Sequence, residues 1–324
     1  MLLGNLYFRS ENLLNNKPEI HFMAPPLIIH IGLPKTGTTF LQKQVFSQLE
    51  GITYIGRHSR TDTRTGLALA RTLRRASPVI WEDGAKSVPR LNILKGLQHA
   101  DTDIPVLVSH ENCFCRTATI VRGAPALCPV RVAEHIRWLD EYFWNGAEVR
   151  IVLSLRRQDE WLTSAYAEQA FKMDVSGQKD FEAKMRAAVD PAEFGRFSYL
   201  DYGRLVELLR HAVGEENLFV MLHEELKEKP AETLASLCRF IGLDEYPPQI
   251  PEGRENVRAV GSNRWKLHDR APEKKRVARR LAQGREEAIE LHEGLRAQIL
   301  EYCRPFNLGL SRLLGHDLGR YGYT

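Results

Sequence analysis

The residues best suited to chemistry lie in a short turn that contains two glycines. In chain order they are Gly32, Lys35, Gly37, Thr38 and Thr39. The apolar run before this turn is typical of a buried strand, and the run FLQKQVFSQL after it has apolar residues at near-helical spacing. A turn that joins a strand to a helix directs backbone N–H groups and the positive end of the helix dipole at one point. The pattern therefore predicts an anion-binding site.

The position of the lysine restricts the class of protein. A Walker loop has the form G-x-x-x-x-G-K-[ST], with the lysine directly after the second glycine. Here the glycine spacing is kept, but the lysine lies inside the turn at Lys35. A nucleotide kinase would also be expected to carry a magnesium-binding aspartate at a strand end, and none is evident. A P-loop kinase remains one alternative. Another is a non-catalytic nucleotide-binding protein, although that function would not explain the position of Lys35.

A second polar group follows the apolar run Val149–Leu155. Arg156 and Arg157 come directly after this predicted strand, and Ser164 lies eight residues beyond Arg156 in a predicted helix. A guanidinium gives phosphate a forked and permanently charged partner, and a helix-borne hydroxyl adds a second donor from a fixed direction. Taken alone, the arginine pair is more typical of a solvated surface. Together with the first turn, it predicts a second anion contact.

A proton acceptor is expected at a neighbouring strand end. The run PVLVS is followed directly by His110 and Glu111, and open α/β sheets bind their ligands at the carboxyl ends of the strands. Because side chains alternate along an extended backbone, only one of the two is expected to face the cleft, and Glu111 is preferred over His110. Either could instead be a structural hydrogen-bonding group. Weaker candidates follow the first helix: Glu50, Arg57 and His58.

These groups need a sheet to position them. Four apolar runs are predicted to be strands: 27–31, 105–109, 149–155 and 217–222. Helical spacing of apolar residues appears around 132–143, 161–171 and 232–243. Strands that alternate with helices predict an α/β fold with a central parallel sheet flanked by helices, a three-layer, P-loop-like architecture.

The motifs resemble those of one enzyme family. The run LPKTGTTF closely resembles the 5'-phosphosulfate loop of sulfotransferases that use PAPS (3'-phosphoadenosine 5'-phosphosulfate), usually written PK-[ST]-G-[ST]-[ST]-[WLF]. Arg156 and Ser164 take the places of that family's 3'-phosphate motif, although Arg157-Gln158 stands where Asn-Pro or Asp-Pro is usual. The run ENLFVMLHEELKEKPAETLASLCRFIGL is similar to the family's late strand and helix. Arg258 precedes Trp265 by the spacing of the RKGxxGxWK segment, whose other positions differ here.

The resemblance implies sulfonate transfer from PAPS to a hydroxyl or amine, with PAP as the second product and no required metal. Lys35 would neutralise charge on the leaving oxygen, and Glu111 or His110 would be the general base. The overall pattern is closest to bacterial, carbohydrate-sulfotransferase-like members, so a saccharide or glycolipid acceptor is expected. The nucleotide contacts implied are Pro34, Lys35, Thr36, Gly37, Thr38, Thr39, Arg156, Ser164 and Arg258.

Composition limits the other possibilities. Apolar residues make up 43% and charged residues 27% of the 324 residues, which argues for a folded chain. The net charge of +4 is too small to argue for nucleic acid as a partner. Five scattered cysteines do not form a disulfide framework, and Cys113, Cys115 and Cys128 lack further ligands at the spacing of a metal site. No apolar run approaches the roughly 20 residues that span a bilayer, so a cytoplasmic location is expected.

Residues 25–324 are expected to form a single domain. Residues 1–24 are an N-terminal tail in which GNLYFRS is similar to a protease-cleavage linker. The polar stretches 57–103 and 172–200 interrupt the alternation of strands and helices and are expected to carry acceptor contacts. The basic stretch 264–285 is typical of a solvated helix face, with an anionic acceptor surface as the alternative.

Overall fold

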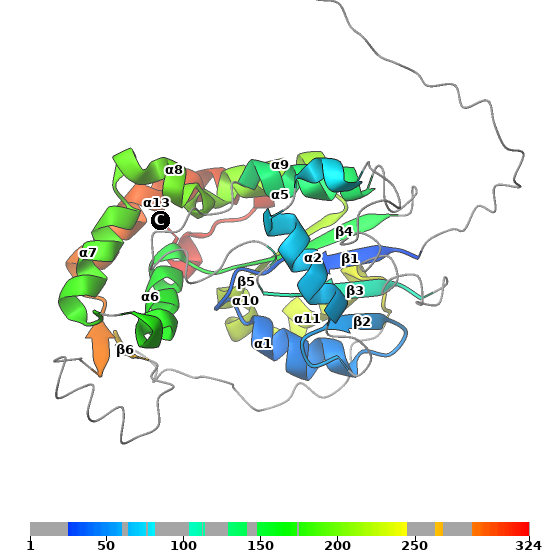
Figure 1. Cartoon of the computed structure of the whole chain (residues 1–324), viewed down its shortest axis with the longest axis horizontal. Coiled ribbons are helices and arrows are strands. Elements are labelled where there is room, and N and C mark those ends of the chain that lie inside the picture. Colours follow the sequence, from blue (N-terminus) through cyan, green and yellow to red (C-terminus); the bar gives the residue numbers. More distant parts are fainter. Residues whose placement is uncertain are drawn as a thin grey trace, which may run out of the picture.

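The computed structural model (Figure 1) describes most of the chain beyond the N-terminal tail. The described residues are 25–59, 64–75, 77–81, 104–111, 113, 129–140, 148–173, 175–244, 263–267 and 287–323. In this part of the chain, no helix is both long enough and apolar enough to cross a membrane.

A parallel sheet of five strands forms the centre of the molecule. Its strands are β1 (Leu27–His30), β2 (Thr53–Gly56), β3 (Val106–Ser109), β4 (Val149–Leu155) and β5 (Leu218–Leu222), in the spatial order β2-β3-β1-β4-β5. The predicted parallel sheet and its four predicted strands are confirmed. Strand β2 was not predicted, because its four residues form no long apolar run and end in a glycine.

Alternate residues of the central strand pack into two separate apolar clusters. Leu27 and Ile29 belong to a large cluster that includes residues of α2 (Arg64–Arg75), α5 (Pro129–Trp138) and α9 (Tyr202–Val213). Ile28 belongs to a second cluster with α10 (His223–Glu228) and α11 (Pro230–Phe240). In Figure 1 the helices α5 and α9 lie on one side of the sheet and α1 and α11 on the other. The three-layer arrangement is the predicted one.

The helix after β1 is irregular. It starts as α1 (Thr38–Phe40), continues as a π-helical turn over Leu41–Val45 and ends as a 3₁₀ turn over Phe46–Gln48. One amphipathic helix was expected here, and its apolar residues Leu41, Val45 and Phe46 are indeed buried. Isolated π turns inside helices occur often at functional sites.

Three helices lie beyond the carboxyl ends of the strands: α6 (Gln158–Gln169), α7 (Gln178–Ala188) and α13 (Glu293–Leu314). The polar stretch 172–200, which was expected to carry acceptor contacts, is largely helical, and its residues Phe181, Met185 and Ala188 pack into the core. The remaining short elements are η3 (Pro78–Trp81), η6 (Ala170–Lys172), η7 (Pro191–Glu193), α8 (Phe194–Phe197), η8 (Ser198–Leu200) and η9 (Gly319–Tyr321). A separate antiparallel pair joins β6 (Arg264–Lys266) and β7 (Ala288–Glu290).

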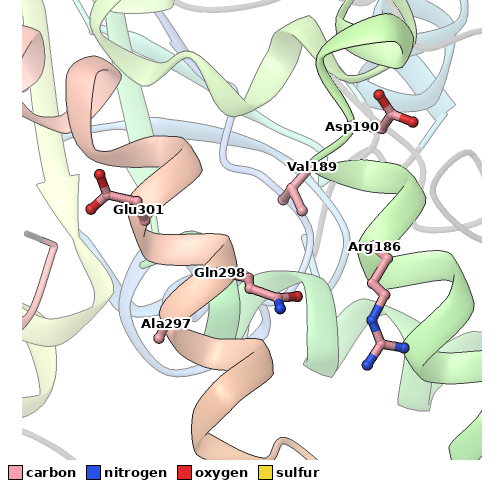
Figure 2. A pocket seen from close by; sticks show the side chains of 6 residues that line it. All are labelled: Arg186, Val189, Asp190, Ala297, Gln298 and Glu301. Atoms are coloured by element: carbon pink, nitrogen blue, oxygen red, sulfur yellow. The ribbon is translucent and has the colours of Figure 1, made fainter.

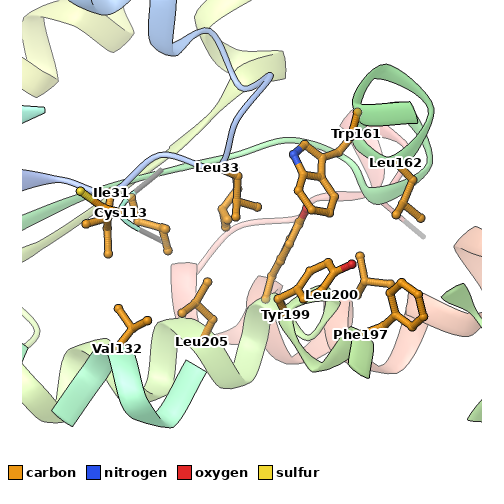
Figure 3. Packing of buried hydrophobic residues seen from close by; sticks show 14 of the residues in the cluster. Ile31, Leu33, Cys113, Val132, Trp161, Leu162, Phe197, Tyr199, Leu200 and Leu205 are labelled. Carbon is orange, nitrogen blue, oxygen red and sulfur yellow. The ribbon is translucent and has the colours of Figure 1, made fainter. Parts of the chain in front are cut away.

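The core reaches directly under the glycine-containing turn. Leu33, in the turn, is fully buried and points toward Trp161 of α6 in Figure 3. Trp161 in turn packs edge-on against Tyr199, with ring centroids 5.5 Å apart. The turn is therefore supported from below by tightly packed apolar side chains, which resist displacement.

Candidate active site

Three successive carbonyl groups of the turn are held by side chains. Leu33 O accepts from the hydroxyl of Thr36 (2.6 Å), Pro34 O from the indole of Trp161 (2.6 Å) and Lys35 O from the guanidinium of Arg156 (3.2 Å). The carbonyl and the N–H of one peptide unit point in opposite directions. Holding these carbonyls against the protein therefore turns the N–H groups of Lys35 and Thr36 the other way, as an anion-binding loop requires.

Two residues of the turn have left-handed backbone conformations. Lys35 has φ +71° and Gly37 has φ +89°. A β-carbon at Gly37 would also lie only 3.3 Å from Nδ1 of His223, so both the conformation and the space favour glycine there. A lysine with positive φ is uncommon in proteins, and such residues concentrate at functional sites. The turn thus has the strained backbone of a binding loop, and Lys35 and Gly37 in it are partly exposed.

The hydroxyl of Thr36 is used inside the turn, because it donates to Leu33 O and its residue is fully buried. Thr36 can therefore offer a ligand only its backbone N–H. Thr38 is buried at the first position of α1, and Thr39 beside it is partly exposed. The sequence analysis did not distinguish these three threonines.

Helix α6 presents one polar stripe to the turn. Glu160, Ser164 and Glu168 follow one another at four-residue spacing along α6 and are partly exposed. The residues between them are buried. Nζ of Lys35 lies 3.7 Å from a carboxylate oxygen of Glu168. Glu168 was not predicted, although its spacing from Ser164 could have indicated that it shares that helix face.

The two arginines after β4 have different surroundings. Arg156 donates to Lys35 O and to Glu160 (2.9 Å), so it lies against the turn. Arg157 forms two hydrogen bonds with the fully buried carboxylate of Asp159 (2.6 and 2.9 Å) and one with Tyr321 O (3.1 Å). The guanidinium of Arg157 is therefore occupied by the protein, and Arg156 is the arginine placed beside the turn.

Contacts from the C-terminal part of the chain support this region. Arg296 of α13 lies 2.6 Å from Asp159 and 3.4 Å from Glu160. The hydroxyl of Tyr323 donates to Glu224 (3.0 Å), which also accepts from the backbone N–H of Arg157 (3.1 Å). No local sequence pattern predicts these links, since they join residues far apart in the chain.

The end of β5 brings His223 and Glu224 next to the turn. His223 lies below Gly37, and burial is the main reason that its pKa falls to about 3, so the ring is neutral. Burial raises the pKa of Glu224, while its hydrogen bonds to Arg157 and Tyr323 act in the opposite direction. These two groups were not predicted as parts of the site.

On the other side of β1, the end of β3 carries the two candidate bases. Glu111 is 24% exposed and accepts from the guanidinium of Arg57, with a distance of 3.0 Å. His110 is partly exposed and precedes it. His58, next to Arg57, is exposed and has φ +69°. The structure thus joins Glu111 to Arg57, one of the weaker candidates, while Glu50 is exposed at the end of the first helix.

Several predicted features lie outside the described residues. They are Arg258, the basic residues Lys274, Lys275, Arg276, Arg279 and Arg280, and two of the three cysteines weighed as metal ligands, Cys115 and Cys128. Among the residues that are described, no group of three or more His, Cys, Asp or Glu side chains is arranged to hold a metal ion.

A cavity of about 670 Å³ lies between α7 and α13 (Figure 2). Its lining residues are Arg186, Val189, Asp190, Ala297, Gln298 and Glu301. None of them is a predicted site residue, and Figure 1 shows α7 well separated from α1. The glycine-containing turn is therefore a different region of the molecule.

Comparison with known proteins agrees with this architecture. The family model described as "Sulfotransferase domain" matches residues 25–258. A sulfotransferase crystal structure from Alicyclobacillus acidocaldarius superposes with a TM-score of 0.52 at 14% identity, covering 92% of this chain and 99% of that one.

Two sulfotransferase domains align less closely. One comes from the Synechococcus PCC 7002 olefin synthase (TM-score 0.34, 16% identity, 71% of this chain and 77% of that chain covered). The other comes from the curacin biosynthetic pathway (TM-score 0.35, 10% identity, 69% and 76% covered). No curated protein sequence matches this chain.

Proposed function

Because this chain belongs to the sulfotransferase domain family, we propose that it transfers the sulfonate group of PAPS to a hydroxyl or amine of a saccharide or glycolipid. The observation that carries the proposal is the meeting of Lys35 and Arg156 at one strained turn, where Arg156 donates to Lys35 O. Two permanent cations beside N–H donors suit a ligand with separate anionic groups, as the phosphosulfate and the 3'-phosphate of PAPS are.

In this proposal the turn holds the 5'-phosphosulfate. The N–H groups of Lys35, Thr36 and Gly37 and the hydroxyls of Thr38 and Thr39 would donate to its oxygens. Arg156 and Ser164 would hold the 3'-phosphate from β4 and α6. Pro34 would contribute to the turn's shape, and Arg258 would close over the nucleotide.

The chemical step is an in-line displacement at sulfur. The acceptor oxygen or nitrogen forms a bond to sulfur while the bond from sulfur to the bridging phosphate oxygen breaks. Glu111 takes the proton that the acceptor loses, and PAP leaves with its new negative charge beside the ammonium of Lys35. Fixed charges of this kind act without reorganisation when the transition state forms, so they lower its free energy more than water would.

The ion pair with Arg57 supports Glu111 over His110 as the base. The pair holds the carboxylate in one orientation at the end of β3. Arg57 is 59% exposed, so its side chain could turn aside when an acceptor arrives. His110 stays the alternative base.

The contacts of α13 with α6 also support a single domain over residues 25–324. Arg296 binds two carboxylates of α6, and fully buried residues of α13 share the larger core cluster with the sheet. A segment that contributes to the core of a domain is part of its folding unit.

The proposal is tested by ligand binding and by product analysis. PAP should bind in calorimetry without added metal and raise the melting temperature, because a ligand of the native state stabilises it. ATP with magnesium is the competing ligand, and stabilisation by it alone would favour a kinase. Incubation with PAPS and a panel of saccharides, glycolipids, phenols and amines, followed by mass spectrometry, should give a product heavier by one sulfonate. Binding of PAP without any sulfated product would favour a non-catalytic nucleotide-binding protein.

A further inference from the structure

A buried polar network lies directly beneath the turn. His30, the last residue of β1, is fully buried, and its ring joins two hydroxyls on the neighbouring strands. Nδ1 is 2.8 Å from Oγ of Ser109 on β3, and Nε2 is 2.9 Å from Oγ of Ser154 on β4. The amide of Gln42, in the π-helical turn, also donates to Ser109 (3.0 Å). Polar side chains in the centre of an apolar sheet are costly unless every group is paired.

The donor and the acceptor in each hydrogen bond follow from Tyr54, where the network ends at the carbonyl of Arg57. The hydroxyl of Tyr54 donates to the carbonyl of Arg57 (2.7 Å), and a carbonyl can only accept. Ser109 acts against the burial that raises the pKa of Tyr54, as a hydroxyl that donates to the tyrosine oxygen does. The single proton of Ser109 is then used, so its oxygen accepts from Nδ1–H of His30. Nε2 of His30 is left as an acceptor for the hydroxyl of Ser154.

A neutral imidazole fits this arrangement, because it has one donor and one acceptor. Burial lowers the pKa of His30 to about 3, so the ring is neutral at ordinary pH. The network runs from Ser154 through His30, Ser109 and Tyr54 to Arg57 O, and the Nδ1–H tautomer of His30 fits it. It crosses β4, β1, β3 and β2 at their carboxyl ends.

Both ends of the network touch the proposed reaction centre. Ser154 lies two residues before Arg156, and its β-carbon would be 3.1 Å from a β-carbon placed on Gly32. The same imaginary atom would lie 2.8 Å from Nε2 of His30, so the turn rests directly on the imidazole. At the other end, Arg57 forms the ion pair with Glu111.

We propose that His30, as its Nδ1–H tautomer, is a positioning residue that fixes the donor-binding turn relative to the strand end bearing Glu111. This inference rests on the proposed function, since it assigns the donor to the turn and the proton acceptor to β3. His30 touches neither substrate. It acts through Ser154 and Gly32 on one side and through Ser109, Tyr54 and Arg57 on the other. Displacements of about 1 Å between reacting groups can lower rates about a hundredfold, so a rigid spacer at this point has a large effect.

The tautomer can be tested without any substrate. In a two-bond ¹H–¹⁵N spectrum of the full chain, His30 is identified as the signal that disappears in His30→Gln. We expect its Nδ1 to be protonated and its Nε2 unprotonated at neutral pH. A protonated Nε2, or a ring protonated at both nitrogens, would overturn the assigned network.

The positioning role is tested with Ser109→Ala, Ser154→Ala and the double variant. Each single change should lower kcat about tenfold or more and leave the PAP dissociation constant within about twofold, because the substrates still bind but are misaligned. Since both serines act through one ring, the double variant should be little worse than the poorer single variant. His30→Asn, whose amide can still donate to Ser109, should retain more activity than His30→Leu.

Thr163→Ala is the matched control, because Thr163 is a buried hydroxyl that bonds only to Asp159 O of its own helix (2.7 Å) among the described contacts. It should lower the melting temperature about as much as either serine change and leave kcat unchanged. Wild-type kcat in both serine variants would refute the positioning role, as would losses that add in the double variant or follow PAP affinity. If the wild-type chain transfers no sulfonate at all, the proposed function fails instead, and the spectrum still decides the network.

Discussion

The two sides of β1 are built differently. On the β4 and β5 side, Arg156, Arg157, Glu160 and Glu224 are all partly or fully buried and bound to backbone groups, to one another or to α13. On the β3 and β2 side, Glu111 is held by a single ion pair to Arg57, which is 59% exposed. Exposed ion pairs contribute little free energy and are easily rearranged.

The difference indicates which part of the reaction this scaffold constrains. An invariant nucleotide suits a rigid, interlocked half, and a variable acceptor suits a half with few fixed contacts. Apart from Lys35 and the buried network around His30, changes on the rigid side should therefore affect donor binding or folding, whereas changes on the other side should affect turnover alone. The predictions below test this division.

The largest effect is expected at Glu111. Glu111→Gln removes the proton acceptor but keeps the size of the side chain and a hydrogen-bonding group for Arg57. We expect kcat to fall by roughly 10² to 10⁴, the usual range for a general base, with PAP affinity unchanged in calorimetry. His110→Ala is the paired variant and should have little effect. The reverse pattern would identify His110 as the general base. Wild-type turnover in both variants would leave Glu50 and His58 as the candidate bases.

Lys35→Ala should separate binding from chemistry within the donor side. If Lys35 stabilises charge that develops on the leaving oxygen, kcat should fall about a hundredfold while PAP affinity falls less. Lys43→Ala is the control, since Lys43 is an exposed lysine of the same helical run. Equal losses in kcat and in PAP affinity would show that Lys35 acts by uniform binding instead.

The two arginines should respond differently. Arg156→Ala should weaken PAP binding by roughly 1.5 to 3 kcal/mol, the range for hydrogen bonds to charged groups. Arg157→Ala should mainly lower the melting temperature, because it leaves the fully buried carboxylate of Asp159 with Arg296 as its remaining cation. Calorimetry and thermal unfolding of both variants measure this. A larger loss of PAP binding in Arg157→Ala would show that the phosphate contact had been assigned to the wrong arginine.

The smallest effect concerns Glu168, whose carboxylate competes with the donor for Lys35. Both side chains of this pair are about a quarter exposed, so the pair is worth at most about 1 kcal/mol. Glu168→Gln should therefore tighten PAP binding up to about fivefold. Glu182→Gln, which removes a carboxylate paired with Arg186 on α7, is the control and should not change the affinity. Weaker PAP binding in Glu168→Gln would contradict the competition.

The sequence predicted the parts of the fold that are encoded locally. Buried parallel strands are continuous apolar runs, so β1, β3, β4 and β5 could be found, whereas β2 begins with Thr53, ends in Gly56 and has only Tyr54 and Ile55 between them. The polar stretch 172–200 has a helical apolar face that packs on the core. This face was not predicted, because most residues of the stretch are polar.

The same distinction applies to the site. Lys35 and the glycines of the turn are neighbours in the chain, so their spacing alone predicted an anion-binding loop. The contacts of Lys35 with Glu168 and of Asp159 with Arg296 join residues more than 130 positions apart, and only the folded chain brings them together. His30 was passed over because a single polar residue in an apolar run has no pattern of its own.

The hydrogen bond from Trp161 to Pro34 O gives the molecule an optical signal. Indole emission responds to the hydrogen bonding and the polarity around the ring, and this indole is fully buried with its N–H on the turn itself. A ligand that shifts the turn would change the brightness or colour of that emission, and a rapid-mixing instrument could record the change. Four other tryptophans contribute background. The emission of the Trp161→Phe variant gives this background, which can then be subtracted. Binding and release of the nucleotide could therefore be followed in real time without a label.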